Sequence, residues 1–188
     1  MLAGSFNFDF LRKGKKVSFS SEVQLRREIN TSDVEQMVEW TADAEVMRFM
    51  NEKPDMSRRL EKLLEESQMD IFTHHFNRKS RFYLVDLQDS GDPVGYLRLI
   101  PKSRDKLEMV VAIADKDKWN NGLGTRAVWE GLKEAFLHLR FDKVEAKIHK
   151  ENRPSIRVFK KAGFAKKEDS AKKETFQLTF DEFIKMVA

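Results

Sequence analysis

The chain has 188 residues, of which 40% are hydrophobic and 35% are charged. A chain of this length can bury a hydrophobic core, and its apolar content excludes a disordered protein. The sequence contains no cysteine, which excludes disulfides, thiolate metal sites and a cysteine nucleophile. Its longest apolar run, Met109 to Ala114, is far shorter than the roughly 20 residues that a membrane-spanning helix needs. We therefore expect one soluble, cytoplasmic domain over residues 1–188.

The charges are unevenly distributed along the chain. The 35 basic and 31 acidic side chains give a net charge of +4, which describes an intermixed surface more than a basic protein. Residues 31–70 hold 11 acidic and 5 basic side chains, whereas residues 141–173 hold 5 acidic and 11 basic ones. The first region suits a cation and the second an anion, although either could be a solvated helix face. No ladder of aromatic residues accompanies the lysines of the second region, so we do not expect nucleic acid as a partner.

The hydrophobic pattern predicts a mixed α/β domain without repeats or low-complexity linkers. Phe6, Phe8 and Phe10 alternate with polar residues before a basic turn, which predicts an N-terminal hairpin over residues 6–19. The apolar spacing predicts the further elements in this order: a strand at 23–28, a helical region from 31 to 50 broken near 41–43, a helix from 56 to 76, strands at 82–87, 94–100 and 107–113, a helix at 123–139, a strand at 143–148, a helix at 153–162, two strands near 164 and 175–178, and a terminal helix at 181–187.

A glycine-rich turn is the clearest local signal. The segment Trp119-Asn120-Asn121-Gly122-Leu123-Gly124-Thr125 follows a predicted strand and opens a predicted helix. Glycines let the backbone approach a ligand, and the N-terminus of a helix favours phosphate groups, so a pyrophosphate suits this turn. Gly122, Gly124 and Ala127 also match a dinucleotide fingerprint, but residues 115–121 separate the strand from the first glycine, which argues against that fold. A glycine-rich helix entry without a ligand stays open as the alternative.

A second motif lies one strand further along the chain. It begins a helix with Asn152-Arg153-Pro154-Ser155 and closes it with Ala162-Gly163-Phe164. Together with the segment from Ile113 to Thr125, it resembles the two acetyl-CoA signatures of the GNAT superfamily of N-acetyltransferases. A third stretch, Glu39 to Val46, is similar to the first helical region of the branch that contains ribosomal-protein alanine N-acetyltransferases. The resemblance spans about residues 22–180, and the three motifs stand in the order and spacing of that family.

The resemblance implies a single-domain GNAT-like α/β fold, in which helices flank a mixed central sheet of about seven strands. Residues 1–20 would form an N-terminal hairpin extension that covers the sheet or meets a second subunit of a homodimer. The cosubstrate acetyl-CoA would lie where two parallel strands, 107–113 and 143–148, splay apart, and the acceptor would enter from the other side. Carried over by motif, the residues that bind acetyl-CoA are Val111, Ala112, Ile113, Ala114, Trp119, Asn120, Asn121, Gly122, Leu123, Gly124, Thr125, Asn152, Ser155 and Phe159.

The resemblance also suggests the group that activates the acceptor. An alkyl ammonium is protonated at neutral pH, so a base must remove a proton before the nitrogen can attack the thioester. By its position on the strand, Glu108 is the first candidate for this base, acting through water, and His149 is the second. The alternative for Glu108 is an exposed strand carboxylate paired with Lys106 or Arg98.

Two positions depart from the family pattern. Trp119 stands where many relatives carry an arginine or glutamine, so pyrophosphate binding would depend mainly on the backbone. Phe159 stands where many relatives carry a tyrosine that protonates the leaving thiolate, and phenylalanine has no proton to give. We therefore expect a working enzyme in which water or Ser155 assists the leaving group. The alternative is a non-catalytic, acyl-CoA-binding GNAT-like module.

The resemblance implies an acetyl-CoA-dependent N-acetyltransferase that acts on a primary amine in a ternary complex. The acceptor would be the N-terminus of a protein or a small cationic amine, and no membrane is expected as a partner. We expect the acceptor side to be formed by Trp40, Phe49, His74, His75 and Tyr96. Adjacent histidines point apart on a helix or a strand, so we expect no metal site at His74 and His75.

Overall fold

The computed structural model describes residues 9–12, 15–18, 22–48, 50 and 54–188. Phe6, Phe8 and Phe19 of the predicted hairpin, and Phe49 of the predicted acceptor side, lie outside the described residues. The strands are β1 (Asp9–Arg12), β2 (Lys15–Ser18), β3 (Val23–Arg26), β4 (Arg81–Leu87), β5 (Pro93–Pro101), β6 (Lys106–Ile113), β7 (Lys143–His149), β8 (Ala165–Asp169) and β9 (Lys173–Thr179). The helices are α1 (Thr31–Ala42), α2 (Ala44–Met47), α3 (Met56–Glu66), α4 (Thr73–Phe76), the 3-10 turn η1 (Lys116–Lys118), α5 (Leu123–Lys133), the π-helix η2 (Glu134–His138), α6 (Arg153–Lys161) and α7 (Phe180–Val187).

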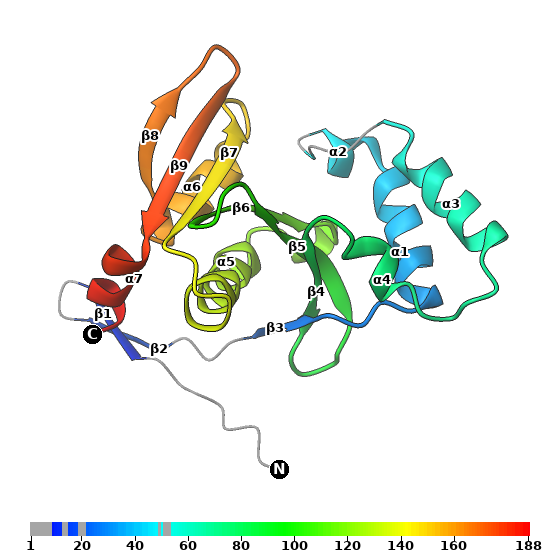
Figure 1. The fold of residues 1–188 in the computed structure, drawn as a ribbon, viewed down its shortest axis with the longest axis horizontal. Coiled ribbons are helices and arrows are strands. Elements are labelled where there is room, and N and C mark those ends of the chain that lie inside the picture. The colour runs from blue at the N-terminus through cyan, green and yellow to red at the C-terminus, as the bar shows by residue number, and fades with distance from the viewer. Residues whose placement is uncertain (1–8, 13–14, 19–21, 49, 51–53) are drawn as a thin grey trace.

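Seven strands form the central sheet in the order β3-β4-β5-β6-β7-β9-β8, and β1 and β2 pair separately as a hairpin (Figure 1). Among the described strands, β6 and β7 are the parallel neighbours, and the other neighbouring pairs of the sheet are antiparallel. The predicted α/β fold, with a mixed sheet of about seven strands and one parallel pair, is confirmed.

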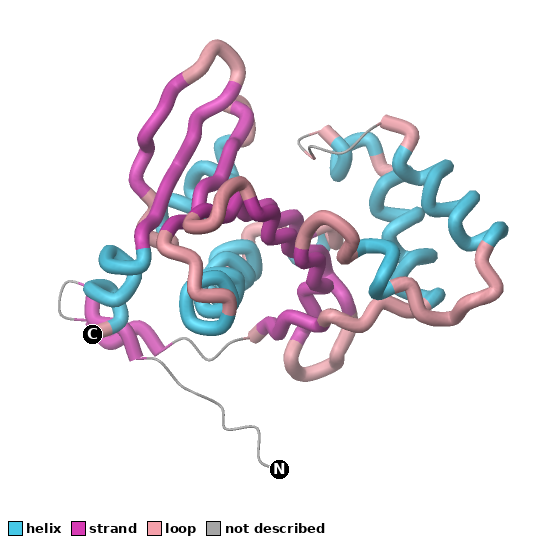
Figure 2. The backbone as a smooth tube through the Cα atoms, viewed as in Figure 1, coloured by secondary structure: helices cyan, strands magenta, loops and turns pink. Residues whose placement is uncertain are grey.

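The parallel pair separates after a few residues. β6 and β7 are paired from Lys106↔Lys143 to Glu108↔Glu145. Beyond this point β6 continues beside β5, and β7 continues beside β9. A Cβ at Gly95 of β5 would overlap the backbone of β6, so glycine permits the close approach that keeps β6 on β5. Figure 2 shows the strands β7, β9 and β8 standing away from the rest of the sheet, as the predicted splay requires.

Helices cover the two faces of the sheet. Along β6, Leu107 and Met109 belong to the hydrophobic cluster that includes α5 and α6, whereas Val110 and Ala112 contact the cluster that includes α1 and α3. This alternation follows from the two-residue period of a strand. Figure 1 shows α1, α3 and α4 grouped beside β4 and β5, with the β7–β9–β8 strands on the other side of a gap. The cleft described below is lined by residues of both β5 and β7.

The prediction of one helix from 56 to 76 is wrong. α3 ends at Glu66, and α4 is a separate short helix. In the segment between them, the Phe72 N–H donates to the Ile29 oxygen at 2.7 Å, and the Thr31 N–H donates to the Asp70 oxygen at 3.1 Å. Ile71 matched the apolar spacing of a helix, but it lies in this extended segment, where it forms an isolated antiparallel bridge with Asn30 and its side chain is exposed.

The break predicted near residues 41–43 is confirmed. Asp43 ends α1 and caps α2, since its Oδ1 accepts hydrogen bonds from the N–H groups of Glu45 at 2.8 Å and Val46 at 3.1 Å. The chain thus changes direction at Asp43, and α2 with the residues after it lines the cleft described below.

Candidate active site

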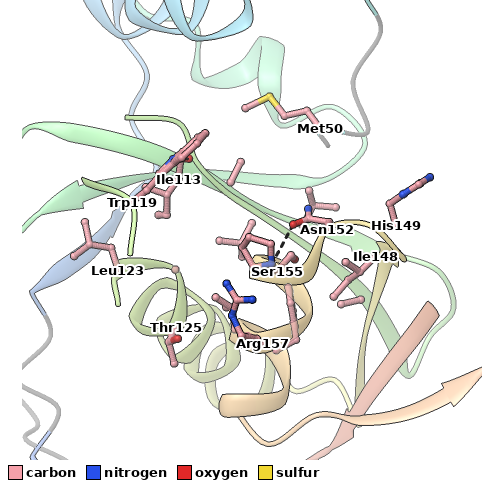
Figure 3. A pocket seen from close by; sticks show the side chains of 18 of the residues that line it. Met50, Ile113, Trp119, Leu123, Thr125, Ile148, His149, Asn152, Ser155 and Arg157 are labelled. Carbon is pink, nitrogen blue, oxygen red and sulfur yellow. Dashed lines mark hydrogen bonds between the residues drawn. The ribbon is translucent and has the colours of Figure 1, made fainter. Parts of the chain in front are cut away.

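A cleft with a volume of about 630 Å³ lies where β6 and β7 separate (Figure 3). Its walls come from the ends of β6 and β7, the starts of α5 and α6, and α2 with the residues after it. The predicted acetyl-CoA-binding residues that line it are Val111, Ala112, Ile113, Trp119, Asn120, Gly122, Leu123, Gly124, Thr125, Asn152, Ser155 and Phe159. Ala114 and Asn121 do not line the cleft: Ala114 is buried against the α1 and α3 cluster, and the side chain of Asn121 is exposed.

The edge of β6 offers backbone groups to the cleft. The Ala114 N–H donates to the Val94 oxygen of β5 at 2.8 Å, so the even-numbered residues at this end of β6 turn toward β5. Val111 and Ile113 consequently turn toward β7, beyond the last paired residue of β6. The indole Nε1 of Trp119 donates to the Ile113 oxygen at 2.8 Å, so this carbonyl already accepts a hydrogen bond from within the protein. Val111 therefore offers the edge where an extended chain can pair like an added strand.

The start of α5 is shaped to hold an anion. Asn120 and Gly122 adopt left-handed conformations with φ of 64° and 82°. Such a turn directs successive N–H groups to one side. No side-chain hydrogen bond caps α5, and the Thr125 N–H already donates to the Gly122 oxygen at 3.0 Å, so the N–H groups before Thr125 are the ones that the start of the helix offers to a ligand. Figure 3 shows the guanidinium of Arg157, on α6, reaching toward this end of the cleft, where it adds a positive charge.

The start of α6 places two polar side chains in the cleft. The Asn152 Oδ1 accepts a hydrogen bond from the Ser155 N–H at 3.1 Å and so caps the helix. Because the amide oxygen is engaged by the cap, the amide NH2 is the group that can donate to a ligand. The side chain of Ser155 lies beside it (Figure 3).

Glu108 lies on β6 before the splay and does not line the cleft. Its carboxylate is 3.0 Å from the Lys102 Nζ and 3.9 Å from the Lys147 Nζ, and the side chain is 13% exposed. Glu108 is thus a paired strand carboxylate, but it is largely buried where the alternative predicted an exposed one, and its partners are Lys102 and Lys147 in place of the predicted Lys106 and Arg98. Lys147 also lines the cleft, so Glu108 is connected to the cleft through this cation.

His149 lines the edge of the cleft. Its Nδ1 accepts a hydrogen bond from the Glu151 N–H at 3.3 Å, so a neutral ring in this arrangement carries its proton on Nε2. Figure 3 shows the imidazole pointing away from Ser155 and Asn152. Phe159 is buried, with its ring edge-on to Phe164 at a centroid distance of 5.0 Å.

The residues expected on the acceptor side are not all at the cleft. Tyr96 lines it from β5. Trp40 is buried in the core that supports α1 and does not reach the cleft. His74 and His75 lie on α4, which is hydrogen-bonded beside the start of α1, whereas α2 follows the end of α1. The fold thus separates the histidine pair from the cleft.

The charged residues of the cleft are mostly basic. Of the described lining residues, one is acidic, Glu45, and the basic ones are Arg48, Lys118, Lys147, Arg157 and Lys161. The acidic excess of residues 31–70 therefore lies largely elsewhere on the described surface. Arg157 and Lys161 were not predicted as cleft residues, although their spacing of four places both on the face of α6 that carries Pro154 and Val158.

A family model described as an acetyltransferase (GNAT) domain matches residues 24–165. The chain belongs to the GNAT acetyltransferase family. It is 22% identical over 144 residues to an uncharacterized N-acetyltransferase, p20, from Bacillus licheniformis, covering 74% of this chain and 78% of that protein. The fold is shared with spermidine N-acetyltransferase from Vibrio cholerae, solved with CoA and spermine, at a TM-score of 0.71 and 16% identity over 88% of this chain and 99% of that one. It is also shared with the aminoglycoside acetyltransferase AAC(6')-Ib, solved with acetyl-CoA, at a TM-score of 0.72 and 16% identity over 89% and 98% of the two chains.

This GNAT chain is an acetyl-CoA-dependent N-acetyltransferase, as predicted. The cleft fits the cosubstrate, because it combines an unpaired strand edge at Val111, left-handed turns before α5 and the charge of Arg157. Within the part of the chain that the structure describes, no group of three or more metal-ligating side chains could hold a metal ion. No helix among the described residues is long and apolar enough to cross a membrane.

Proposed function

We propose that the protein transfers the acetyl group of acetyl-CoA to a primary amine by direct attack in a ternary complex. The observation that carries this proposal is the cleft where β6 and β7 separate. The two segments that resemble acetyl-CoA signatures line one side of it, and α2 with the residues after it lines the other. The chain has no cysteine to accept an acetyl group first, which favours direct attack over a thioester on the enzyme.

We assign the donor half to two sets of groups. The N–H groups from Asn120 to Thr125 would hold the pyrophosphate, with the Thr125 hydroxyl and Arg157 beside them. The backbone of Val111 and the amide NH2 of Asn152 would hold the pantetheine. Charge-assisted bonds of this kind are typically worth about 1.5–3 kcal/mol each, which suits a ligand with several phosphate groups.

Proton transfer would use one group behind the lining of the cleft and two groups that line it. Glu108 stays our candidate for the base, acting through water, and the role of Lys147 would be to hold its carboxylate toward the cleft. His149 is the second candidate, but its Nδ1 must first release the N–H of Glu151. Ser155 is the hydroxyl we assign to the leaving thiolate, because Phe159 offers no proton.

For the acceptor we propose a small cationic amine or the N-terminus of a protein. The first is supported by two proteins of similar fold, a spermidine N-acetyltransferase and an aminoglycoside acetyltransferase. The second is supported by the similarity of Glu39 to Val46 to the ribosomal-protein branch of the family.

The test is release of CoA thiol from acetyl-CoA with a panel of amines. Spermidine, an aminoglycoside and peptides with a free N-terminus form the panel, and the same peptides with a blocked N-terminus are the control. Amine-dependent CoA release with stoichiometric acetylated product supports the proposal. Tight binding of acetyl-CoA with no release for any amine would favour the non-catalytic acyl-CoA-binding module, which the loss of the tyrosine at Phe159 motivates.

A further inference from the structure

An ion pair joins the loop before α5 to the first helices. Lys116 begins η1, and its Nζ lies 2.7 Å from the Asp43 Oδ2 and 3.5 Å from the Glu45 Oε2. The other oxygen of Asp43 caps α2 through the N–H groups of Glu45 and Val46. One carboxylate therefore fixes the start of α2 and the position of the loop at the same time.

Each joined segment supplies a different half of the cleft. After Lys116, the loop continues through Lys118 and Trp119 into the turn assigned to the pyrophosphate. After Asp43, the chain contributes Val46, Arg48 and Met50 to the opposite wall. The Lys116–Asp43 ion pair thus joins the two segments. Both residues lie outside the cleft, so neither needs to touch a substrate.

The loop is the more firmly held of the two segments. The N–H groups of Ala114 and Asp115 both donate to the Val94 oxygen, at 2.8 and 3.1 Å, and the Trp119 indole is bonded to Ile113. α2 is a single turn, with Val46 as its buried residue. A short helix gains little stability of its own, so its placement depends on tertiary contacts such as the one to Lys116.

We propose that Lys116 is a positioning residue that couples the two halves of the cleft, so that acetyl-CoA on the loop stabilises α2 where it completes the acceptor side. The proposal rests on the proposed function, because it requires acetyl-CoA to bind at the turn before α5. Binding linkage is reciprocal, so the amine also strengthens acetyl-CoA binding. The side chains of Lys116 and Asp43 are 43% and 32% exposed, so the coupling is modest, about two- to fivefold in affinity.

Hydrogen exchange on the full chain tests the coupling with acetyl-CoA as the probe. In the wild type, acetyl-CoA should slow exchange both in the loop at residues 116–125 and in α2. In Lys116→Met, acetyl-CoA should still protect the loop, but the added protection of α2 should be lost. Asp43→Asn keeps an oxygen for the helix cap and removes its charge, so it should lose part of the added protection, because Glu45 still lies 3.5 Å from Lys116. Lys116→Arg should restore the protection.

Lys62→Met is the matched control. Lys62 forms an ion pair with Glu66 on α3 at 3.4 Å, with side chains 69% and 67% exposed, and lies outside the cleft. It should leave the protection of both segments unchanged. With an amine substrate, Lys116→Met should raise the KM for the amine about two- to fivefold and change kcat less than twofold.

The outcomes separate the two proposals. No protection of the loop in the wild type would overturn the proposed function. Protection of the loop without protection of α2 in the wild type would overturn the coupling alone. Equal protection of α2 in the wild type, Lys116→Met and Asp43→Asn would overturn the role of Lys116.

Discussion

Gly124 provides a sharp test of where acetyl-CoA lies. A Cβ at this position would be 3.4 Å from the Val158 Cγ2 and 3.8 Å from the Ile113 Cγ1, which are ordinary contact distances. Alanine therefore fits, whereas the two further methyl groups of valine would occupy the space between side chains that line the cleft. These methyl groups would keep the ligand from the N–H groups of the turn, and losing about 2 kcal/mol of charge-assisted hydrogen bonding corresponds to about a 30-fold weaker affinity. We predict this loss for Gly124→Val and less than about a threefold change for Gly124→Ala.

Thermal unfolding with acetyl-CoA measures the effect. At about 100 times the wild-type Kd, the ligand adds about 2.7 kcal/mol, or roughly 5–11 °C for a chain of this size. For Gly124→Val the same concentration is about three times the Kd and adds about 0.8 kcal/mol, or roughly 2–3 °C. Calorimetric titration gives the Kd directly, and unfolding without ligand controls for a change in stability. Unchanged acetyl-CoA affinity in a well-folded Gly124→Val would refute the phosphate-loop assignment.

Three further predictions concern the donor half and the core. Arg157→Ala should weaken acetyl-CoA binding about tenfold or more by titration, and an unchanged Kd would leave the pyrophosphate to the backbone alone. Phe159→Tyr should raise kcat about tenfold or more if protonation of the leaving thiolate limits the rate, and an unchanged kcat would show that a tyrosine adds nothing to the assistance from water or Ser155. Arg26 holds the buried Asp33 at 2.7 Å and the buried Asp86 at 2.6 Å, so Arg26→Met should destabilise the fold by about 3–5 kcal/mol in denaturant titrations. Burial already raises the pKa of Asp86, and a carboxyl group whose pKa is raised by folding stabilises the fold as the pH falls. The loss of stability in Arg26→Met should therefore be smaller near about pH 5 than near about pH 8. The opposite trend would contradict this explanation.

Local patterns in the sequence predicted most of the elements. The strand of Leu107 to Ile113 and the Asp43 break could be found because a two-residue apolar period and a capping side chain act within a few residues. The helix from 56 to 76 failed for a physical reason, since Phe72 is held by a backbone bond to Ile29, far away in the sequence. No local period can report such a bond.

The candidate site also combines features that local sequence determines with features that depend on tertiary contacts. The sequence by itself determined the turn at Asn120 and Gly122 and the cap at Asn152, because these depend on the conformational freedom and side-chain oxygens of single residues.

The tertiary structure alone decided which side chains meet at the cleft. It placed Arg157 opposite the turn before α5, kept Trp40 and the α4 histidines away, and paired Glu108 with Lys102 and Lys147. These outcomes depend on where β6 and β7 separate and on how α1 and α2 pack beside them. That geometry comes from contacts between distant segments, and no short stretch of the chain contains the information.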